Sequence, residues 1–208
     1  MKGSTRWYDA EQLRRISEVT IAHYDRSAEA YWNGTRDHDV TQNYAALLDA
    51  IEGDPPYSIL DLGCGPGRDL RYFRSLGHDV VGLDGSTEFV AMARSYSECE
   101  VLQQDFLAME LPESRFDGIF ANASLFHVPS QELPRVLAEL SKTLRSRWRF
   151  VHLALDDGVP QGSGRLACRA RAFLGSEHGA ASGRHLSARA GPECRRTFRG
   201  SVCGCIKD

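Results

Sequence analysis

The sequence predicts an α/β fold, with a doubly wound, mostly parallel sheet that carries helices on both faces. Three observations lead to this prediction. Short apolar runs alternate with segments whose apolar residues recur at helical spacing. The first run ends in Asp61 and is followed by glycines at positions 63, 65 and 67. The second run ends in Asp84, seventeen residues after Gly67. Strands alternating with helices form parallel sheets through right-handed crossovers.

The elements are expected in a regular order along the chain. Strands are predicted over residues 58–62, 79–83, 100–103 and 116–121. Helices are predicted around residues 44–51, over 67–76, after Ser86 and after Ser130. Both serines are expected to act as N-caps, and Gly77 is expected to end the second helix. Leu133, Val136, Leu137, Leu140 and Leu144 are expected to face the core from the last helix.

Size and charge limit the functions that the chain can have. Its 208 residues fit one domain with a real core, and its net charge of −3 predicts no general affinity for nucleic acid or anionic membranes. No apolar run is long enough to cross a membrane, and residues 1–19 carry charges where a secretory signal would be apolar. The expected location is therefore cytoplasmic, with reduced cysteines. The cysteine and histidine spacing of the C-terminal part does not fit a zinc site, so no metal is expected.

The glycine-rich turn predicts a ligand. A Cβ at Gly63 or Gly65 would keep a ligand away from the backbone, and a helix N-terminus follows directly. A carboxylate at the end of the next strand, Asp84, can accept hydrogen bonds from a ribose diol. The carboxyl ends of parallel strands meet at one edge of a sheet. We therefore predict a nucleoside-bearing cofactor there, whereas glycines that served only a tight turn would leave Asp84 unexplained.

The segment from Ile21 to Leu144 resembles the class I S-adenosylmethionine-dependent methyltransferases of the small, single-domain type, which have a Rossmann-like fold. Four strand ends carry the resemblance, and they are Asp61-Leu62-Gly63-Cys64-Gly65-Pro66-Gly67, Asp84, Asp105-Phe106 and Phe120-Ala121-Asn122. The resemblance implies S-adenosylmethionine as cofactor and in-line methyl transfer to a small-molecule substrate. It divides the chain into a helical extension (1–20), the cofactor-binding domain (21–145) and an atypical tail (146–208).

The resemblance also implies roles for single residues. Those expected at the methionine end of the cofactor are Asp61, Gly63, Cys64, Gly65, Ala121, Asn122 and Arg36. Arg36 is expected to pair with the carboxylate of the cofactor. Asp84 and the neighbouring Gly85 are expected at the ribose. Asp105 is expected to accept a hydrogen bond from the adenine amino group, with Phe106 beside it. Taken alone, Asp105 would more simply be a turn residue or an N-cap.

Three residues are expected on the substrate side. Tyr31 and Trp32 lie in a segment that resembles the N-terminal cover of such enzymes, and they are either substrate contacts or packed aromatics of the core or lid. His127 follows the fourth strand and is a candidate general base. It could equally cap the next helix or pack locally.

Two other functions are compatible with parts of the sequence. A nucleotide-dependent oxidoreductase would use the pattern G-x-G-x-x-G, but here the third glycine comes one residue early and Arg68 takes its place. A cofactor-binding relic without activity is the second alternative, because the C-terminal third departs from the family pattern.

The tail after Arg145 has a different composition. Residues 146–208 contain 11 of the 25 Lys and Arg but 5 of the 28 Asp and Glu, with few apolar residues at regular spacing. We therefore expect a poorly ordered tail, with a fifth strand at 149–155 and no strand after it. Family members continue here with Pro-Gly-Gly. The segment Ser146–Arg149 can be written TCC CGG TGG CGN, which reads Pro-Gly-Gly when the first T is dropped. We hypothesise a shifted reading frame, and other codons in the gene would refute it.

Overall fold

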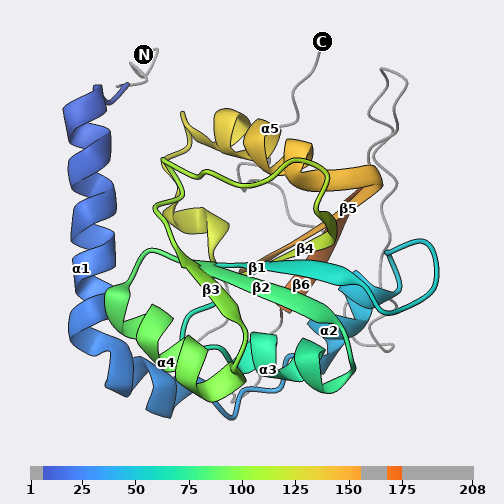
Figure 1. Ribbon diagram of the computed structural model, residues 1–208. Helices are drawn as coiled ribbons and strands as arrows, with labels where there is room; N and C mark the ends of the chain where they lie inside the picture. The colour runs from blue at the N-terminus through green and yellow to red at the C-terminus, as the bar shows by residue number, and fades with distance from the viewer. Residues whose placement is uncertain (1–6, 156–167, 175–208) are drawn as a thin grey trace, which may run out of the picture.

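The computed structural model describes residues 7–155 and 168–174, which form a single six-stranded sheet with flanking helices (Figure 1). The strand order is β3-β2-β1-β4-β5-β6, with β1 to β5 parallel and β6 antiparallel to β5. The strands are β1 (Ser58–Leu62), β2 (Asp79–Asp84), β3 (Glu100–Gln103), β4 (Phe116–Asn122), β5 (Leu144–Leu155) and β6 (Cys168–Leu174). The helices are α1 (Ala10–Thr35), α2 (Thr41–Leu48), α3 (Arg68–Ser75), α4 (Thr87–Ser97), the 3₁₀ turn η1 (Leu125–His127) and α5 (Leu133–Thr143). The predicted α/β fold is confirmed.

Alternate residues of the central strands face opposite sides of the sheet and build two apolar clusters. Ile59 packs with the helices α2, α3 and α4, while its neighbour Leu60 packs with η1 and α5. Figure 1 shows these helices on opposite faces of the sheet. Because both faces are covered, the strands are apolar at nearly every position, as buried parallel strands are.

Helix α1 begins with a capping box. The carboxylate of Asp9 accepts a hydrogen bond from the backbone of Gln12, whose side chain accepts one from the backbone of Asp9. The helix then runs along the edge of the domain beside α4 (Figure 1). The boundary expected between residues 20 and 21 falls inside α1. The expected extension and the start of the cofactor-binding domain are therefore one continuous helix.

The two expected N-caps have different outcomes. Ser86 caps α4, because its Oγ accepts a hydrogen bond from Phe89 N at 3.1 Å. The expectation for Ser130 was wrong, since α5 begins at Leu133 with no side-chain cap and with a proline in its first turn.

One residue of α5 that was expected in the core, Leu137, is 38% exposed. It follows Val136, which faces the core, by one residue and therefore points about 100° away from it.

Strand β5 begins at Leu144, earlier than expected. Leu144 pairs with Phe116 and Arg149 with Gly118, so the residues between them form an irregularity in the ladder. From Arg149 onward the register is regular, which confirms the fifth strand. We expected no later strand, yet β6 pairs with β5 over seven residues. An unpaired strand edge offers backbone donors and acceptors to any segment, without need for apolar periodicity. The rest of the predicted tail lies outside the described residues.

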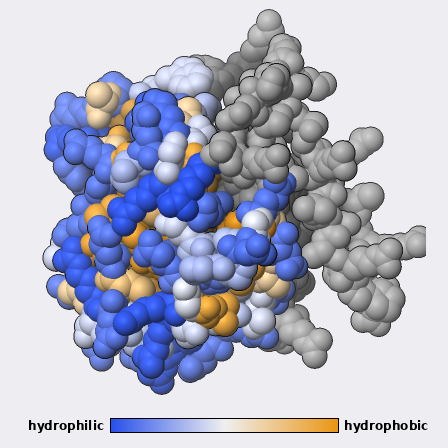
Figure 2. Space-filling view, turned by 45° about the vertical axis from the view of Figure 1, so that its right-hand side comes forward, coloured by the Kyte–Doolittle hydropathy of each residue, from blue (hydrophilic) through white to orange (hydrophobic). Residues whose placement is uncertain are grey.

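Among the described residues, the visible surface is mostly hydrophilic and no helix could span a membrane. Figure 2 shows hydrophilic side chains over most of the visible described surface, with hydrophobic ones in small groups among them. None of the described helices combines the length and apolar character that crossing a bilayer requires.

Candidate active site

A cleft opens where the carboxyl ends of β1 to β4 meet, and its empty volume, including the mouth, is about 730 Å³. This is where ligands bind in doubly wound sheets. Its walls come from the turns after the four strands, from α1 and from η1. Nine of the predicted site residues line it, namely Tyr31, Gly63, Gly65, Asp84, Gly85, Asp105, Phe106, Asn122 and His127.

The glycine turn after β1 leaves backbone open to the cleft. Gly63 has φ +74° and Gly65 has φ +52°, and Gly63 N donates a hydrogen bond to Leu83 O at 2.7 Å. A Cβ on Gly63 would lie 2.4 Å from Ser124 Cβ. A Cβ on Gly65 would meet nothing nearer than Tyr31 Cε1 at 3.8 Å. Gly63 is therefore required by packing, whereas Gly65 leaves free space above the main chain.

Asp84 stands at the tip of β2 and connects two turns. Its Oδ2 accepts a hydrogen bond from Gly65 N at 2.9 Å, and its Oδ1 accepts one from Ser86 N at 2.9 Å. Burial raises the pKa of Asp84 above its ordinary value, and these backbone donors oppose that shift. Asp25 of α1 accepts a hydrogen bond from Ser86 Oγ at 2.6 Å, which fastens α1 to the same turn.

The turn after β3 carries the next pair of predicted residues. Asp105 Oδ1 accepts a hydrogen bond from Leu107 N at 2.8 Å, so it is a turn residue and also lines the cleft. The Phe106 ring lies close over Gly63, since its Cζ would be 3.2 Å from a Cβ there. The position of Asp105 is thus compatible with both interpretations, a turn residue and a residue that faces a ligand.

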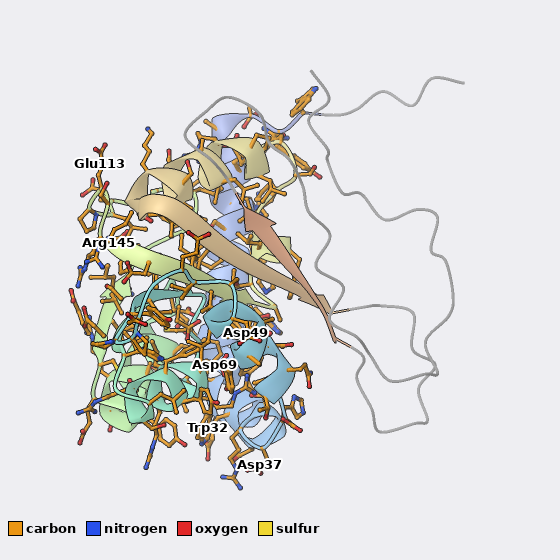
Figure 3. All side chains as sticks on the ribbon, turned by 90° about the vertical axis from the view of Figure 1, so that its right-hand side faces the viewer. Trp32, Asp37, Asp49, Asp69, Glu113 and Arg145 are labelled. Atoms are coloured by element: carbon orange, nitrogen blue, oxygen red, sulfur yellow. The ribbon has the colours of Figure 1, made fainter. Side chains whose placement is uncertain are left out.

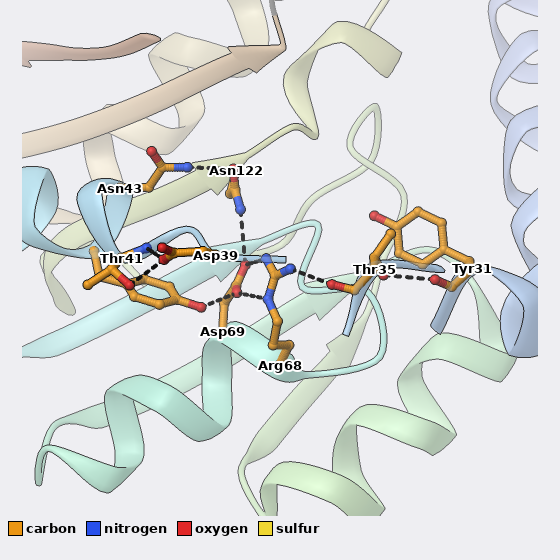
Figure 4. A network of polar contacts seen from close by, with 9 residues as sticks. Tyr31, Thr35, Asp39, Thr41, Asn43, Arg68, Asp69 and Asn122 are labelled. Carbon is orange, nitrogen blue, oxygen red and sulfur yellow. Dashed lines mark hydrogen bonds and ion pairs between the residues drawn. The ribbon is translucent and has the colours of Figure 1, made fainter. Parts of the chain in front are cut away.

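A buried polar network centred on Asp69 lies beside the glycine turn (Figure 4). The carboxylate of Asp69 accepts hydrogen bonds from Tyr44 Oη at 2.6 Å, Arg68 Nε at 2.7 Å and Asn122 Nδ2 at 3.3 Å. Arg68 Nη1 also donates a hydrogen bond to Thr35 O at 2.9 Å, at the end of α1. The network therefore joins α1, α2, α3 and the end of β4.

Asp61 is 1% exposed, and its Oδ2 has no hydrogen-bond partner. Burial raises the pKa of Asp61 well above its ordinary value, and the charge of Asp69 adds to this, whereas Arg68 opposes it. Asp61 does not line the cleft itself. A buried carboxyl oxygen without a partner is costly in a folded protein and indicates a donor supplied from outside the chain.

The hydrogen bond from Tyr44 to Asp69 should contribute measurably to stability. Tyr44→Phe removes a buried donor to a carboxylate, so we expect a loss of about 1.5–3 kcal/mol in the free energy of unfolding by urea. Tyr57→Phe is the control, because Tyr57 Oη donates to Gly53 O at 2.9 Å in an exposed position. Equal losses in both variants would show that Asp69 does not depend on Tyr44.

A tyrosine and a histidine meet across the cleft. Tyr24 Oη of α1 lies 2.9 Å from His127 Nε2 of η1, and both residues line the cleft. Burial lowers the pKa of His127 below its ordinary value, and nearby His23 adds to the shift. The side chain does not cap α5. Tyr24 was not predicted as a site residue.

Besides Asp61, four predicted residues lie outside the cleft. Cys64 is buried, with Sγ against Gly82, and Ala121 is buried in the cluster under α5. Arg36 is half exposed and pairs with Asp37 at 3.4 Å. Trp32 lines a separate groove with Tyr96, and Figure 3 places it near Asp37 at one end of the molecule. Consecutive residues of a helix point about 100° apart, so Tyr31 faces the cleft and Trp32 does not.

Helix α1 supplies four of the twelve lining residues that were not predicted from the sequence. These residues are Ser17, Thr20, Ile21 and Tyr24, and they share a helix face with Tyr31. Their spacing of three, four and seven residues is that of one helical stripe. This periodicity was the available signal, although it does not by itself distinguish a site from a core.

Residues 59–147 match the family model described as a methyltransferase domain. These residues form a methyltransferase domain. The cofactor of such a domain is S-adenosylmethionine. The open backbone at Gly65 leaves room for its amino-acid end, and the carboxylate of Asp84 beside it fits its sugar hydroxyls. Among the residues that the structure describes, no cluster of His, Cys, Asp and Glu could hold a metal ion.

Several known proteins resemble this methyltransferase domain. Malonyl-[acyl-carrier protein] O-methyltransferase of Pectobacterium atrosepticum is 32% identical over 73% of this chain and 56% of that protein. The probable S-adenosyl-L-methionine-dependent methyltransferase TehB of Haemophilus influenzae is 24% identical over 65% of this chain and 48% of its own length. The chain spans about half the length of the curated relatives it matches.

Solved structures share the fold. A TehB-like SAM-dependent methyltransferase from Corynebacterium glutamicum has a TM-score of 0.56 at 25% identity, covering 65% of this chain and 74% of its own. The 1,6-didemethyltoxoflavin-N1-methyltransferase of Burkholderia thailandensis, solved with 1,6-didemethyltoxoflavin and S-adenosylhomocysteine, has a TM-score of 0.59 at 20% identity, covering 83% of this chain and 76% of its own.

Proposed function

We propose that this protein transfers a methyl group from S-adenosylmethionine to a small molecule by in-line displacement. One observation carries the proposal. The carboxylate of Asp84 and the open main chain at Gly65 are in direct contact, at 2.9 Å, across the tips of β2 and β1. A sugar diol and an amino-acid chain attached to it would find their partners side by side there.

The proposed roles of the other residues follow the strand ends. The ribose hydroxyls donate hydrogen bonds to Asp84, whose carboxylate has acceptor sites left beyond its two backbone donors. Asp105 and Phe106 hold the adenine, and the methionine end lies along Gly63 and Gly65. When bound, the cofactor supplies an activated methyl group. The chain's own contribution is to align the acceptor and exclude water, for which α1 forms the cover.

His127 is the proposed general base for an oxygen or nitrogen acceptor, which must lose a proton. Burial lowers the pKa of His127 below its ordinary value, which favours the neutral imidazole that a base requires. We expect the rate to fall as the pH drops through an apparent pKa below 6.5, and His127→Asn to lower the rate and abolish this acidic limb. The measurement is a pH–rate profile of both proteins, and an unchanged profile in the variant would remove His127 from the reaction.

The lowered pKa of His127 also makes the free energy of unfolding depend on pH. A histidine whose pKa is lowered by folding binds its proton more readily in the unfolded state. Its contribution to stability is therefore present at neutral pH and is lost as the pH falls through the unfolded value toward the folded one.

Two measurements test the proposed function. Labelled methyl donor is added with the protein to a metabolite extract, and transfer of label into small molecules is expected. Thermal melts are recorded with S-adenosylhomocysteine and with NAD, and only the former is expected to raise the melting temperature. Stabilisation without transfer indicates the relic alternative. Stabilisation by NAD alone indicates the oxidoreductase alternative.

A further inference from the structure

We propose that the methyl acceptor is an amine, and not a molecule that presents a carboxylate or phosphate to the site. This inference rests on the proposed function and concerns the part of the cleft left over by the cofactor. That part is formed by the α1 stripe of Ser17, Thr20, Ile21 and Tyr24, and by the segment from His127 to Pro129. The lining that the structure describes contains no Lys or Arg at all.

The cations nearest to the cleft are already engaged. Arg68 is held by Asp69 at 2.7 Å and by Thr35 O at 2.9 Å. Arg135 donates a hydrogen bond to the backbone oxygen of Leu107, a lining residue, but it pairs with two carboxylates, Glu132 just before α5 at 2.7 Å and Glu139 on α5 at 2.9 Å. Among the described lining residues, an anionic group brought into the cleft would find no Lys or Arg as a partner, and a buried charge without a protein partner is unfavourable.

Several features of the cleft favour a cation. Asp84 and Asp105 are proposed to bind the cofactor, but their carboxylates also make the potential of the whole cleft more negative. The rings of Tyr24, Tyr31 and Phe89 form a continuous cluster with centroid separations of 5.1–5.7 Å. Aromatic rings attract ammonium groups through their faces. Residues 1–145 also contain 23 Asp and Glu against 14 Lys and Arg, so the field around the domain draws cations toward it.

The neutral imidazole completes the site for an amine. An amine that arrives as ammonium loses a proton to the Tyr24–His127 pair, whose polar atoms are 2.9 Å apart. The nitrogen lone pair then forms the N–C bond while the C–S bond breaks, and sulfur keeps the electron pair. The methylated nitrogen carries the positive charge that the sulfonium loses, so the charge within the cleft is conserved. The proton on the imidazole leaves to solvent.

The test uses pairs of probes that share the ring and the two-carbon linker and differ in the end group, which is an ammonium in one and a carboxylate in the other. Tryptamine is compared with indole-3-propionate, and phenethylamine with 3-phenylpropionate. Binding to the protein saturated with S-adenosylhomocysteine is measured by calorimetry, and methyl transfer is measured with labelled donor. We expect each amine to bind at least tenfold more tightly than its matched acid and to be the member that is methylated. Acids that bind as tightly, or the failure of both amines to bind the loaded protein, overturn the proposal. Absence of S-adenosylhomocysteine binding contradicts the proposed function instead.

A charge introduced on α1 provides a second test. Thr20→Lys places a cation in the acceptor part, and Thr20→Met is the control of similar length without charge. The lysine variant is expected to shift the amine-to-acid preference at least tenfold toward the acid, while the methionine variant keeps the preference for amines. An identical preference in both variants contradicts the claim that charge in this part of the cleft selects the acceptor.

Discussion

The variant Gly63→Ala is expected to unfold at much lower urea concentration than the wild type, with a loss of about 3 kcal/mol or more in the free energy of unfolding. Two costs add up in this variant. Its backbone has φ +74°, which is unfavourable for alanine, and the new methyl group would lie 2.4 Å from Ser124 Cβ. The backbone on both sides is fixed by hydrogen bonds to Leu83 O, so the turn cannot move aside easily.

Gly65→Ala separates these two costs. Its φ of +52° is also left-handed, but the added Cβ would have 3.8 Å of clearance. We expect a loss of only about 1 kcal/mol in stability, together with clearly weaker binding of S-adenosylhomocysteine, because the methyl group takes space above the open main chain. Equal loss of stability in the two alanine variants would show that contact with Ser124 does not determine the need for Gly63.

Asp84→Ala is expected to weaken the binding of S-adenosylhomocysteine by about 1–3 kcal/mol, or roughly fivefold to 150-fold. The variant loses the carboxylate proposed to accept the ribose hydroxyls, and Gly65 N loses its partner at 2.9 Å. The measurement is titration calorimetry, with a thermal melt to confirm that the variant is folded.

Asp79→Ala is the matched control, because Asp79 stands at the other end of the same strand. Among the described side chains, the carboxylate of Asp79 has one polar contact, a long hydrogen bond from Ser58 Oγ at 3.5 Å. The control should bind S-adenosylhomocysteine as the wild type does. Unchanged affinity of Asp84→Ala would remove Asp84 from the cofactor site.

The strand ends of the site could be predicted from sequence because their signals are local. An apolar run, a carboxylate and alternate glycines define the turn after β1 within nine residues, and Ser86 marks the start of α4 directly. The sheet then brings Asp84 and Asp105 to the same edge, since parallel strands share a direction. No knowledge of long-range packing was needed for these residues.

The cover of the site could not be predicted in the same way. Tyr24 and His127 are separated by 103 positions in the sequence, and only the placement of α1 across the cleft brings them together. The direction in which Trp32 and Arg36 point depends on the rotation of α1 about its axis and on the residue at which α1 ends. A helix boundary that is misplaced by a few residues changes both directions. For this reason the sequence did not show that Tyr31 faces the cleft and Trp32 does not.

The region after α5 shows a further limit of sequence patterns. Strand β6 forms through backbone pairing with β5, and a composition rich in arginine and glycine does not reveal such pairing. The match to the methyltransferase family ends at residue 147, and the ladder of β5 is irregular between Leu144 and Arg149. The match ends close to Arg145, where we hypothesise a shifted reading frame, and the codons at 146–149 test this hypothesis.

In the proposed function, the carboxylate of Asp84 and the open main chain at Gly65 hold the sugar and amino-acid ends of a methyl donor. A crystal structure of the protein with S-adenosylhomocysteine would show whether they do. We expect density in the cleft, with ribose oxygens within hydrogen-bond distance of Asp84 and the amino-acid chain lying along Gly63 and Gly65. Density bound elsewhere, or a ribose turned away from Asp84 in a fully occupied cleft, would contradict it.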